Sequence, residues 1–199
     1  MLPLGIFLAD AVITSVAAWL LVRADRHAGR GFLEAFLAWS WSFVALITGA
    51  GVVLGIAGGF GAAGFLALHG AVLAALALTR RRTLATDFKS LRLTGSQLRE
   101  FLNTPGPARL LALGVIVILT ALAVIAALAE SAVVDALTYH LPRVGHWLQA
   151  GEIGIIPGPD TRLNFVAVLP DIVMAWLVGV GREGFPLLVL TQAIGGIMT

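Results

Sequence analysis

The most constraining feature of this chain is a long run of uncharged residues. Positions 35–78 hold 44 residues without an Asp, Glu, Lys or Arg. About 20 predominantly apolar residues suffice to cross the hydrocarbon core of a bilayer, so this run has room for two membrane-spanning helices. A glycine-rich stretch near its middle, Gly58-Gly59-Phe60-Gly61, predicts the turn between them.

The composition of the whole chain agrees with a membrane environment. Hydrophobic residues make up 59% of the 199 positions and charged residues 12%, and the mean hydropathy is +0.96. Average globular proteins are roughly 45–50% apolar and about 25% charged. The sequence therefore predicts an integral membrane protein. Because the sequence holds no cysteine, disulfides, redox-active cysteine pairs and Cys-ligated metal centres are excluded.

Hydropathy predicts an all-α polytopic membrane protein with about six transmembrane helices. Beside the two spans within 35–78, apolar runs cover 2–22, 110–129, 163–180 and 185–199. The first run is not a signal peptide, because its first positive charge, Arg23, follows the apolar stretch instead of preceding it. The last run has only 15 residues, fewer than a span needs. We therefore expect the chain to be the N-terminal portion of a longer protein.

The distribution of basic residues predicts the orientation of these spans. Ten of the 13 Lys and Arg residues lie in two segments, 23–30 and 80–109. Basic residues gather in the cytoplasmic loops of membrane proteins, so both segments are expected in the cytoplasm. The N-terminus and the segment 130–162 are then expected outside. Because the net charge is only +2 and the basic residues lie in loops, no nucleic-acid partner is expected.

Glycines in the second and third spans fit helix packing. Gly51, Gly55 and Gly59 repeat every four residues, the spacing that lets two helices approach closely in lipid. The stretch 59–64 also matches the GxGxxG string of dinucleotide sites. That string requires a preceding strand and a soluble βαβ unit, and both are missing from the predicted elements, so a nucleotide site is rejected.

The basic segment 79–109 has two possible structures. Leu84, Phe88 and Leu91 fall at helical spacing, which is typical of an amphipathic helix lying on the anionic cytoplasmic leaflet. A solvated connector would obey the same charge rule, and both alternatives remain open. Pro105-Gly106-Pro107 predicts the end of any helix here.

The outer segment 130–162 carries the chain's most suggestive group of polar residues. Placed on a helix, positions 135–149 predict an interfacial amphipathic helix between spans four and five, with Trp147 as an interfacial anchor. Pro142 predicts a kink or two shorter helices. The apolar stripe contains Leu137, Leu141, Val144 and Leu148, and the opposite, wet side contains Asp135, Tyr139, Arg143 and His146.

These residue types suit chemistry on a lipid-linked phosphate. A carboxylate can act as general base on a hydroxyl, and arginine or histidine can neutralise a departing phosphate. An ordinary amphipathic surface helix would also have polar residues on its wet side, which is the simpler alternative. His140 and His146 are six residues apart and do not form a ligand pair on one helix face, so no metal is expected.

The same segment resembles a known family of membrane enzymes. The run Asp135-Ala-Leu-Thr-Tyr-His-Leu-Pro-Arg-Val144, followed by His146-Trp147-Leu-Gln149 and Gly151, is similar to the first outer loop of bacterial membrane glycosyltransferases of the GT-C superfamily. These enzymes are related to the protein mannosyltransferases and the aminoarabinose transferase of lipid A. The resemblance covers roughly 110–199 and is strongest over 135–151.

The resemblance implies a function, a set of site residues and a domain organisation. It implies inverting transfer of a sugar from a polyprenyl-phosphate donor to an acceptor hydroxyl of unknown identity, at the outer face of the bacterial inner membrane and without a cofactor. Asp135 would be catalytic. Residues 1–78 would be an N-terminal three-span addition, 79–109 a basic cytoplasmic loop, and 110–199 the start of the core. The expected phosphate-binding residues are Arg143 and Arg162, with His146, His140 and Tyr139 as weaker candidates.

Since family members have more spans than this chain, the 199 residues alone are expected to be inactive. Two rival functions remain, a non-catalytic scaffold and a transporter. The transporter hypothesis depends on Asp10 and Asp171, which are acids within or near apolar runs. We expect Asp10 to lie near the outer end or to pair within the bundle, and His69 to form a hydrogen bond between helices. Asp171 follows Pro170, which suits the first turn of a helix.

Overall fold

A computed structural model describes residues 2–24, 32–107, 140–158, 162–165 and 168–181, with short pieces between 109 and 121. Every regular element in these ranges is a helix, which confirms the all-α prediction for the described part. The helices are α1 (Leu2–Ala24), α2 (Phe32–Ala57), α3 (Ala62–Thr79), α4 (Leu84–Asn103), α6 (Leu141–Ala150), α7 (Arg162–Phe165) and α8 (Val168–Gly181).

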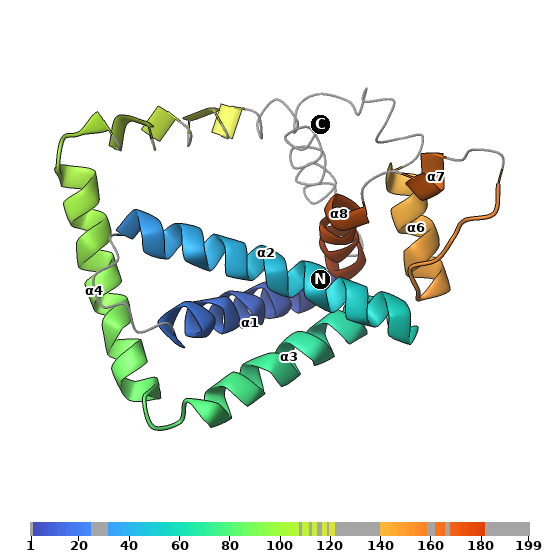
Figure 1. Cartoon of the computed structure of the whole chain (residues 1–199), viewed down its shortest axis with the longest axis horizontal. Helices are drawn as coiled ribbons and strands as arrows, with labels where there is room; N and C mark the ends of the chain where they lie inside the picture. The colour runs from blue at the N-terminus through green and yellow to red at the C-terminus, as the bar shows by residue number, and fades with distance from the viewer. Residues whose placement is uncertain are drawn as a thin grey trace.

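Three long apolar helices form an up-down-up bundle (Figure 1). The stretches Gly5–Arg23, Leu33–Ala57 and Ala62–Thr79 are each long and apolar enough to cross a membrane. The first three predicted spans are thus confirmed as helices of spanning length. The turn between α2 and α3 lies at the predicted glycines, where Gly58 has a φ of 73°. Glycine adopts this left-handed conformation without the steric cost that a Cβ would add.

Helices α1 and α3 end side by side at the basic end of the bundle. The guanidinium of Arg80, just after α3, donates hydrogen bonds to the carbonyl oxygens of Leu20 (2.6 Å) and Arg23 (2.9 Å). The last four carbonyls of a helix have no partner within it, and Arg80 supplies a donor to one of them, that of Arg23. This contact places the C-terminal ends of α1 and α3 at the same end of the bundle.

Gly51 and Gly55 of α2 are packing positions, as predicted, whereas Gly59 lies in the turn after the helix. A Cβ at Gly51 would overlap the side chain of Ile172 in α8, and a Cβ at Gly55 would lie 2.6 Å from Ile153. The backbone N–H of Ile153 also donates to the carbonyl oxygen of Gly55 (3.2 Å). The missing side chains therefore let α8 and the segment after α6 lie directly on the α2 backbone.

The segment from α6 to residue 158 lies at the end of the bundle opposite the basic one. The N–H of Phe60, in the α2–α3 turn, donates to the carbonyl oxygen of Gly151 (2.7 Å). Phe60 is buried and its ring lies edge-on to that of Trp147. The α2–α3 turn and the segment after α6 thus lie at the same end of the bundle.

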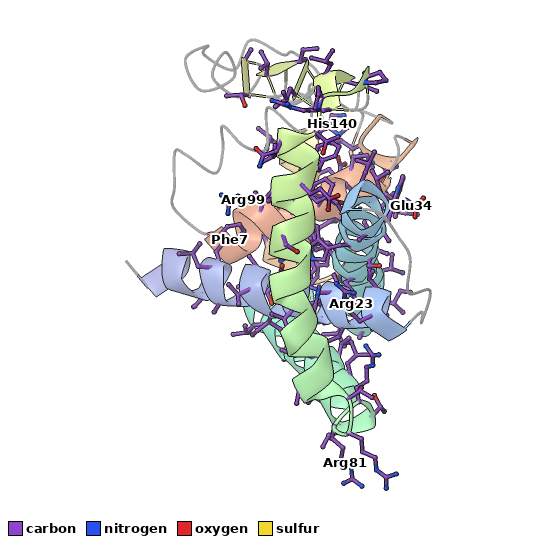
Figure 2. All side chains as sticks on the ribbon, turned by 90° about the vertical axis from the view of Figure 1, so that its left-hand side faces the viewer. Phe7, Arg23, Glu34, Arg81, Arg99 and His140 are labelled. Carbon is purple, nitrogen blue, oxygen red and sulfur yellow. The ribbon has the colours of Figure 1, made fainter. Side chains whose placement is uncertain are left out.

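Helix α4 does not run with the bundle. It crosses the end where α1 and α3 finish, at a steep angle to the three long helices (Figure 1), and it stands in front of them when the molecule is turned by 90° (Figure 2). It ends at Asn103, just before the predicted stop at Pro105. Of the two alternatives for the basic segment, the structure therefore favours the helix.

The remaining predicted spans are not confirmed as such. The fourth span, 110–129, lies largely outside the described residues, and the sixth, 185–199, lies wholly outside them. The fifth, 163–180, overlaps α7 and α8, and residues 166 and 167 between them lie outside the described set. The apolar helical stretch described within it is Val168–Leu177. Pro170 lies in the first turn of α8, where a helix tolerates proline.

The glycine packing generates a prediction with a matched control. Replacing Gly51 by Ala should lower the unfolding temperature of the detergent-purified protein, because overpacking costs about 1–3 kcal/mol. Gly49→Ala, two residues away in the same helix, meets nothing within 4 Å. It should leave the unfolding temperature unchanged or raise it, since alanine favours helix by about 0.5–1 kcal/mol. Equal midpoints for the two variants would contradict the packing role.

Candidate functional site

The described residues contain five buried polar or charged side chains, in two groups. Both groups involve α8. The first group joins α8 to α6, and the second joins α8 to the spanning helices α1 and α3. The first comprises Arg143 and Asp171, and the second comprises Asp10, Thr14 and His69.

Asp171 contacts His140 and Arg143, two residues of the motif that resembles the glycosyltransferase loop. Its Oδ1 lies 2.6 Å from Nδ1 of His140, and its Oδ2 forms an ion pair with Nη2 of Arg143. Asp171 and Arg143 are almost completely buried. An ionised carboxylate can only accept hydrogen bonds, so in that form Asp171 pairs with the histidine tautomer that carries its proton on Nδ1. We call this set of three side chains the Asp171 cluster.

Local sequence explains how the cluster forms. His140 immediately precedes α6 and Arg143 lies three residues later, a spacing that puts both on one side of a helix. Pro142 lies in the first turn of α6, and Gly151 ends the helix with a φ of 75° and a hydrogen bond to the carbonyl oxygen of Trp147 (2.8 Å). Asp171 lies in the first turn of α8, where the helix dipole stabilises a negative charge.

Arg143 was expected on the wet side of the amphipathic helix, and this expectation is wrong. Only 1% of its surface is exposed. Burial is possible because Asp171 supplies the opposite charge that a guanidinium needs when it is removed from water. The guanidinium also lies over the ring of Trp147, with Cζ 5.3 Å from the ring centroid, a favourable cation–π contact.

Trp147 was expected to be an interfacial anchor, and this expectation is also wrong. Its side chain is 2% exposed, and Nε1 donates to the carbonyl oxygen of Gly154 (3.1 Å). Val144 is buried beside it, while Leu141 and Leu148 are half-buried. The buried side of α6 thus faces other parts of the protein, because α8 and the segment after α6 cover it.

The other expected site residues do not join the cluster within the part that the structure describes. His146 is exposed on α6. Arg162 begins α7, and its side chain lies outside the described set. Asp135 and Tyr139 lie entirely outside the described residues. Their proposed roles therefore remain predictions.

Asp10 is paired inside the bundle, which agrees with one of its two expected placements. Its two carboxylate oxygens each lie 3.0 Å from Nδ1 of His69, and Nε1 of Trp176 donates to Oδ2 (2.6 Å). Thr14 donates to the backbone oxygen of Asp10 (2.8 Å), and its Oγ1 lies 2.9 Å from His69 Nδ1. His69 is confirmed as a hydrogen-bonding residue between helices. Such pairing is required because an unsatisfied polar group costs several kcal/mol in lipid.

Helix α8 therefore connects the two groups. Asp171 and Trp176 are five residues apart, or about 7.5 Å along a helix axis. The ring of Trp176 also packs on Phe7 of α1 and Phe43 of α2, with centroids 5.1 and 5.8 Å away. The sequence analysis assigned Asp171 no catalytic role. An acid directly after proline in an apolar run was the available signal, because such acids are costly and need partners.

The Asp171 cluster can orient an imidazole. A carboxylate on Nδ1 fixes the tautomer and the direction of a histidine ring, while Arg143 balances the buried charge. Among the residues that the structure describes, no three His, Asp or Glu side chains converge on a point where a metal ion could bind. The expectation that no metal is used remains a prediction.

Comparisons of the chain with protein-family models, with curated proteins and with solved structures found no match. The resemblance of residues 135–151 to glycosyltransferases accordingly rests on the sequence motif.

The buried ion pair predicts strong coupling between two residues that are far apart in the sequence. Arg143→Met and Asp171→Asn should each destabilise the protein by about 3–5 kcal/mol, since each leaves a buried charge without its partner. The double variant should be destabilised by less than the sum. Denaturation of the purified protein in detergent measures all three.

A third substitution provides the control for this cycle. His146→Ala changes an exposed residue of the same helix, so its effect should stay within about 0.5 kcal/mol. Additive effects of the two cluster substitutions would contradict the pairing of Arg143 with Asp171.

Proposed function

We propose that the chain is the N-terminal part of a bacterial inner-membrane glycosyltransferase of the GT-C type. It would transfer a sugar from a polyprenyl-phosphate donor to an acceptor hydroxyl on the outer face. The observation that carries the proposal is the Asp171 cluster, which ties His140 and Arg143 of the Tyr-His-Leu-Pro-Arg motif to α8. In an ordinary amphipathic surface helix, the polar residues contact water and do not need a buried carboxylate as a partner.

The proposed reaction is an inverting displacement at the anomeric carbon. Asp135 accepts the proton of the acceptor hydroxyl while the hydroxyl oxygen bonds to that carbon. The bond between this carbon and the phosphate oxygen breaks, and the lipid phosphate leaves with the electron pair. A nearby cation stabilises the charge that develops on the phosphate. Asp135 is five residues before His140 in the sequence, so the cluster anchors the segment that carries it.

The structure refines the role proposed for Arg143. Its guanidinium is buried and paired with Asp171, so we assign it the positioning of the loop and not the binding of phosphate. Arg162 is then the arginine proposed for the phosphate, because a guanidinium stays charged and can bind two oxygens. His140, His146 and Tyr139 remain candidates for further contacts with the donor.

A transporter is the alternative that one observation favours. Asp10 and His69 are ionisable residues within spanning helices, a feature often found in proton or ion pathways. However, the Asp10 carboxylate already contacts His69 and Trp176 from two other helices. This arrangement suits a link between helices, so we prefer the enzyme.

Substitution of Asp135 tests the enzymatic proposal. In the protein expressed from its complete gene, Asp135→Asn should reduce sugar transfer by at least about 10²-fold, because loss of general-base catalysis typically costs 10²- to 10⁴-fold. Asparagine keeps the size of the side chain but cannot take up the proton. The measurement is transfer from radiolabelled polyprenyl-phosphate sugars in membranes with matched protein levels.

The control is Glu130→Gln, which removes a nearby carboxylate outside the motif and should have a milder effect. Unchanged transfer by Asp135→Asn would overturn the catalytic assignment. Absence of transfer by the wild-type protein with every donor tested would favour the scaffold alternative.

The proposed orientation is tested by single cysteines, since the chain has no native cysteine. With an impermeant thiol reagent on intact cells, Ala150→Cys should be labelled, while Ala28→Cys and Ser90→Cys should react only after the membrane is opened. The physical reason is the preference of basic segments for the cytoplasm. Labelling at position 90 without labelling at 150 would reverse the topology and remove the proposed site from the outer face.

A further inference from the structure

Helix α4 is positioned like a helix that lies in the plane of a membrane surface. It contains 20 residues, or about 30 Å at 1.5 Å per residue. It starts at Leu84, after a four-residue turn that follows α3, and crosses the basic end of the three spanning helices in both views (Figures 1 and 2). Spans of this length would leave a membrane at this end, which would place α4 at the level of the lipid headgroups.

One side of α4 is apolar in the helical register, and the part of it near the C-terminus of the helix is exposed. At 100° per residue, five positions fall within about 80° of one another. These positions are Leu84, Phe88, Leu91, Leu98 and Leu102. Leu98 and Leu102 are 38% and 41% exposed. Exposed large apolar side chains gathered on one side of a helix favour an apolar partner.

Basic residues follow one edge of this stripe in the helical register. Lys89, Arg92 and Arg99 fall between about 60° and 140° from Leu84. Arg81 and Arg82, in the turn before α4, are exposed. The segment 81–103 contains these five basic residues and only two acids, Asp87 and Glu100. An apolar stripe flanked by positive charge is the pattern of helices that bind anionic lipid surfaces.

We propose that α4 docks on the anionic lipid leaflet at the basic end of the spans. Its leucine and phenylalanine stripe enters the boundary between headgroups and acyl chains, and its lysine and arginine residues contact the anionic headgroups. A lipid surface fits better than a protein partner or nucleic acid, because α4 lies across the ends of membrane-spanning helices. This inference is independent of the proposed glycosyltransferase activity.

Fluorescent labelling of single cysteines tests the depth of α4. The 199-residue protein is placed in nanodiscs of phosphatidylcholine alone, or with one phosphatidylglycerol in every three lipids. An environment-sensitive dye is attached to Leu98→Cys, Leu102→Cys or Glu100→Cys. We expect blue-shifted emission and quenching by brominated lipid at 98 and 102. Neither change is expected at 100, which lies about 160° from the stripe centre.

The emission shift should depend on both the anionic lipid and the positive charge of α4. The shift at 98 and 102 should be larger with phosphatidylglycerol and should decrease at high salt, where the Debye length falls to about 3 Å. Reversing three charges, with Lys89→Glu, Arg92→Glu and Arg99→Glu, should abolish the difference between the two lipid mixtures. The matched control exchanges the same positions without a change of charge, as Lys89→Arg, Arg92→Lys and Arg99→Lys, and should retain the difference.

Three outcomes would overturn the proposal. Equal emission at 98, 100 and 102 would show that the stripe does not face the membrane. A blue shift at 98 and 102 without quenching by brominated lipid would indicate that protein covers the stripe, either the bundle or a second copy of the chain. Quenching that is the same in both lipid mixtures would exclude recognition of anionic lipid.

Discussion

The ion pair between Asp171 and Arg143 is the interaction on which the arrangement of the C-terminal elements depends. A carboxylate and a guanidinium that are buried this completely are tolerated only when each satisfies the other, so the position of α6 is tied to that of α8. His140 completes the set by contacting the second carboxylate oxygen. The segment that resembles a glycosyltransferase loop is therefore anchored at its C-terminal half by a residue 31 positions away along the chain.

A second buried polar contact, made by Trp176, fixes the C-terminal half of α8. Trp176 donates to Asp10, which also pairs with His69, so α8 is linked to α1 and α3 through a buried polar contact. Close approach to α2 depends on the absence of side chains at Gly51 and Gly55. Polar pairing and glycine packing together fix α8 on the first three helices. Because α6 contacts α8, they also hold the Tyr-His-Leu-Pro-Arg motif in place. In the proposed enzyme, this N-terminal addition would stabilise the site without taking part in its chemistry.

The two ends of the bundle differ in chemistry. One end has the α2–α3 turn, the hydrogen bond from Phe60 to Gly151 and the segment after α6. The other has Arg80 on carbonyls near the end of α1, the exposed Arg81 and Arg82, and the transverse helix α4. A division of this kind suits a protein whose one end carries the proposed reaction while the other contacts anionic lipid. Membrane docking of α4 would also restrict the rotation of α3, which precedes it by a short turn.

The sequence by itself determined the helical class, three spanning helices and the turn at Gly58, because each follows from local properties: apolar run length, absence of charge and the conformational freedom of glycine. It also indicated the packing role of Gly51 and Gly55 and the internal pairing of Asp10. Only the tertiary structure decided which side of α6 is buried. Helical spacing shows that Arg143 and His146 share a side in an idealised register, but it does not reveal what lies opposite them. Arg143 is buried instead of exposed because Asp171 pairs with it. The two residues are far apart in the sequence, so no local pattern predicts their contact.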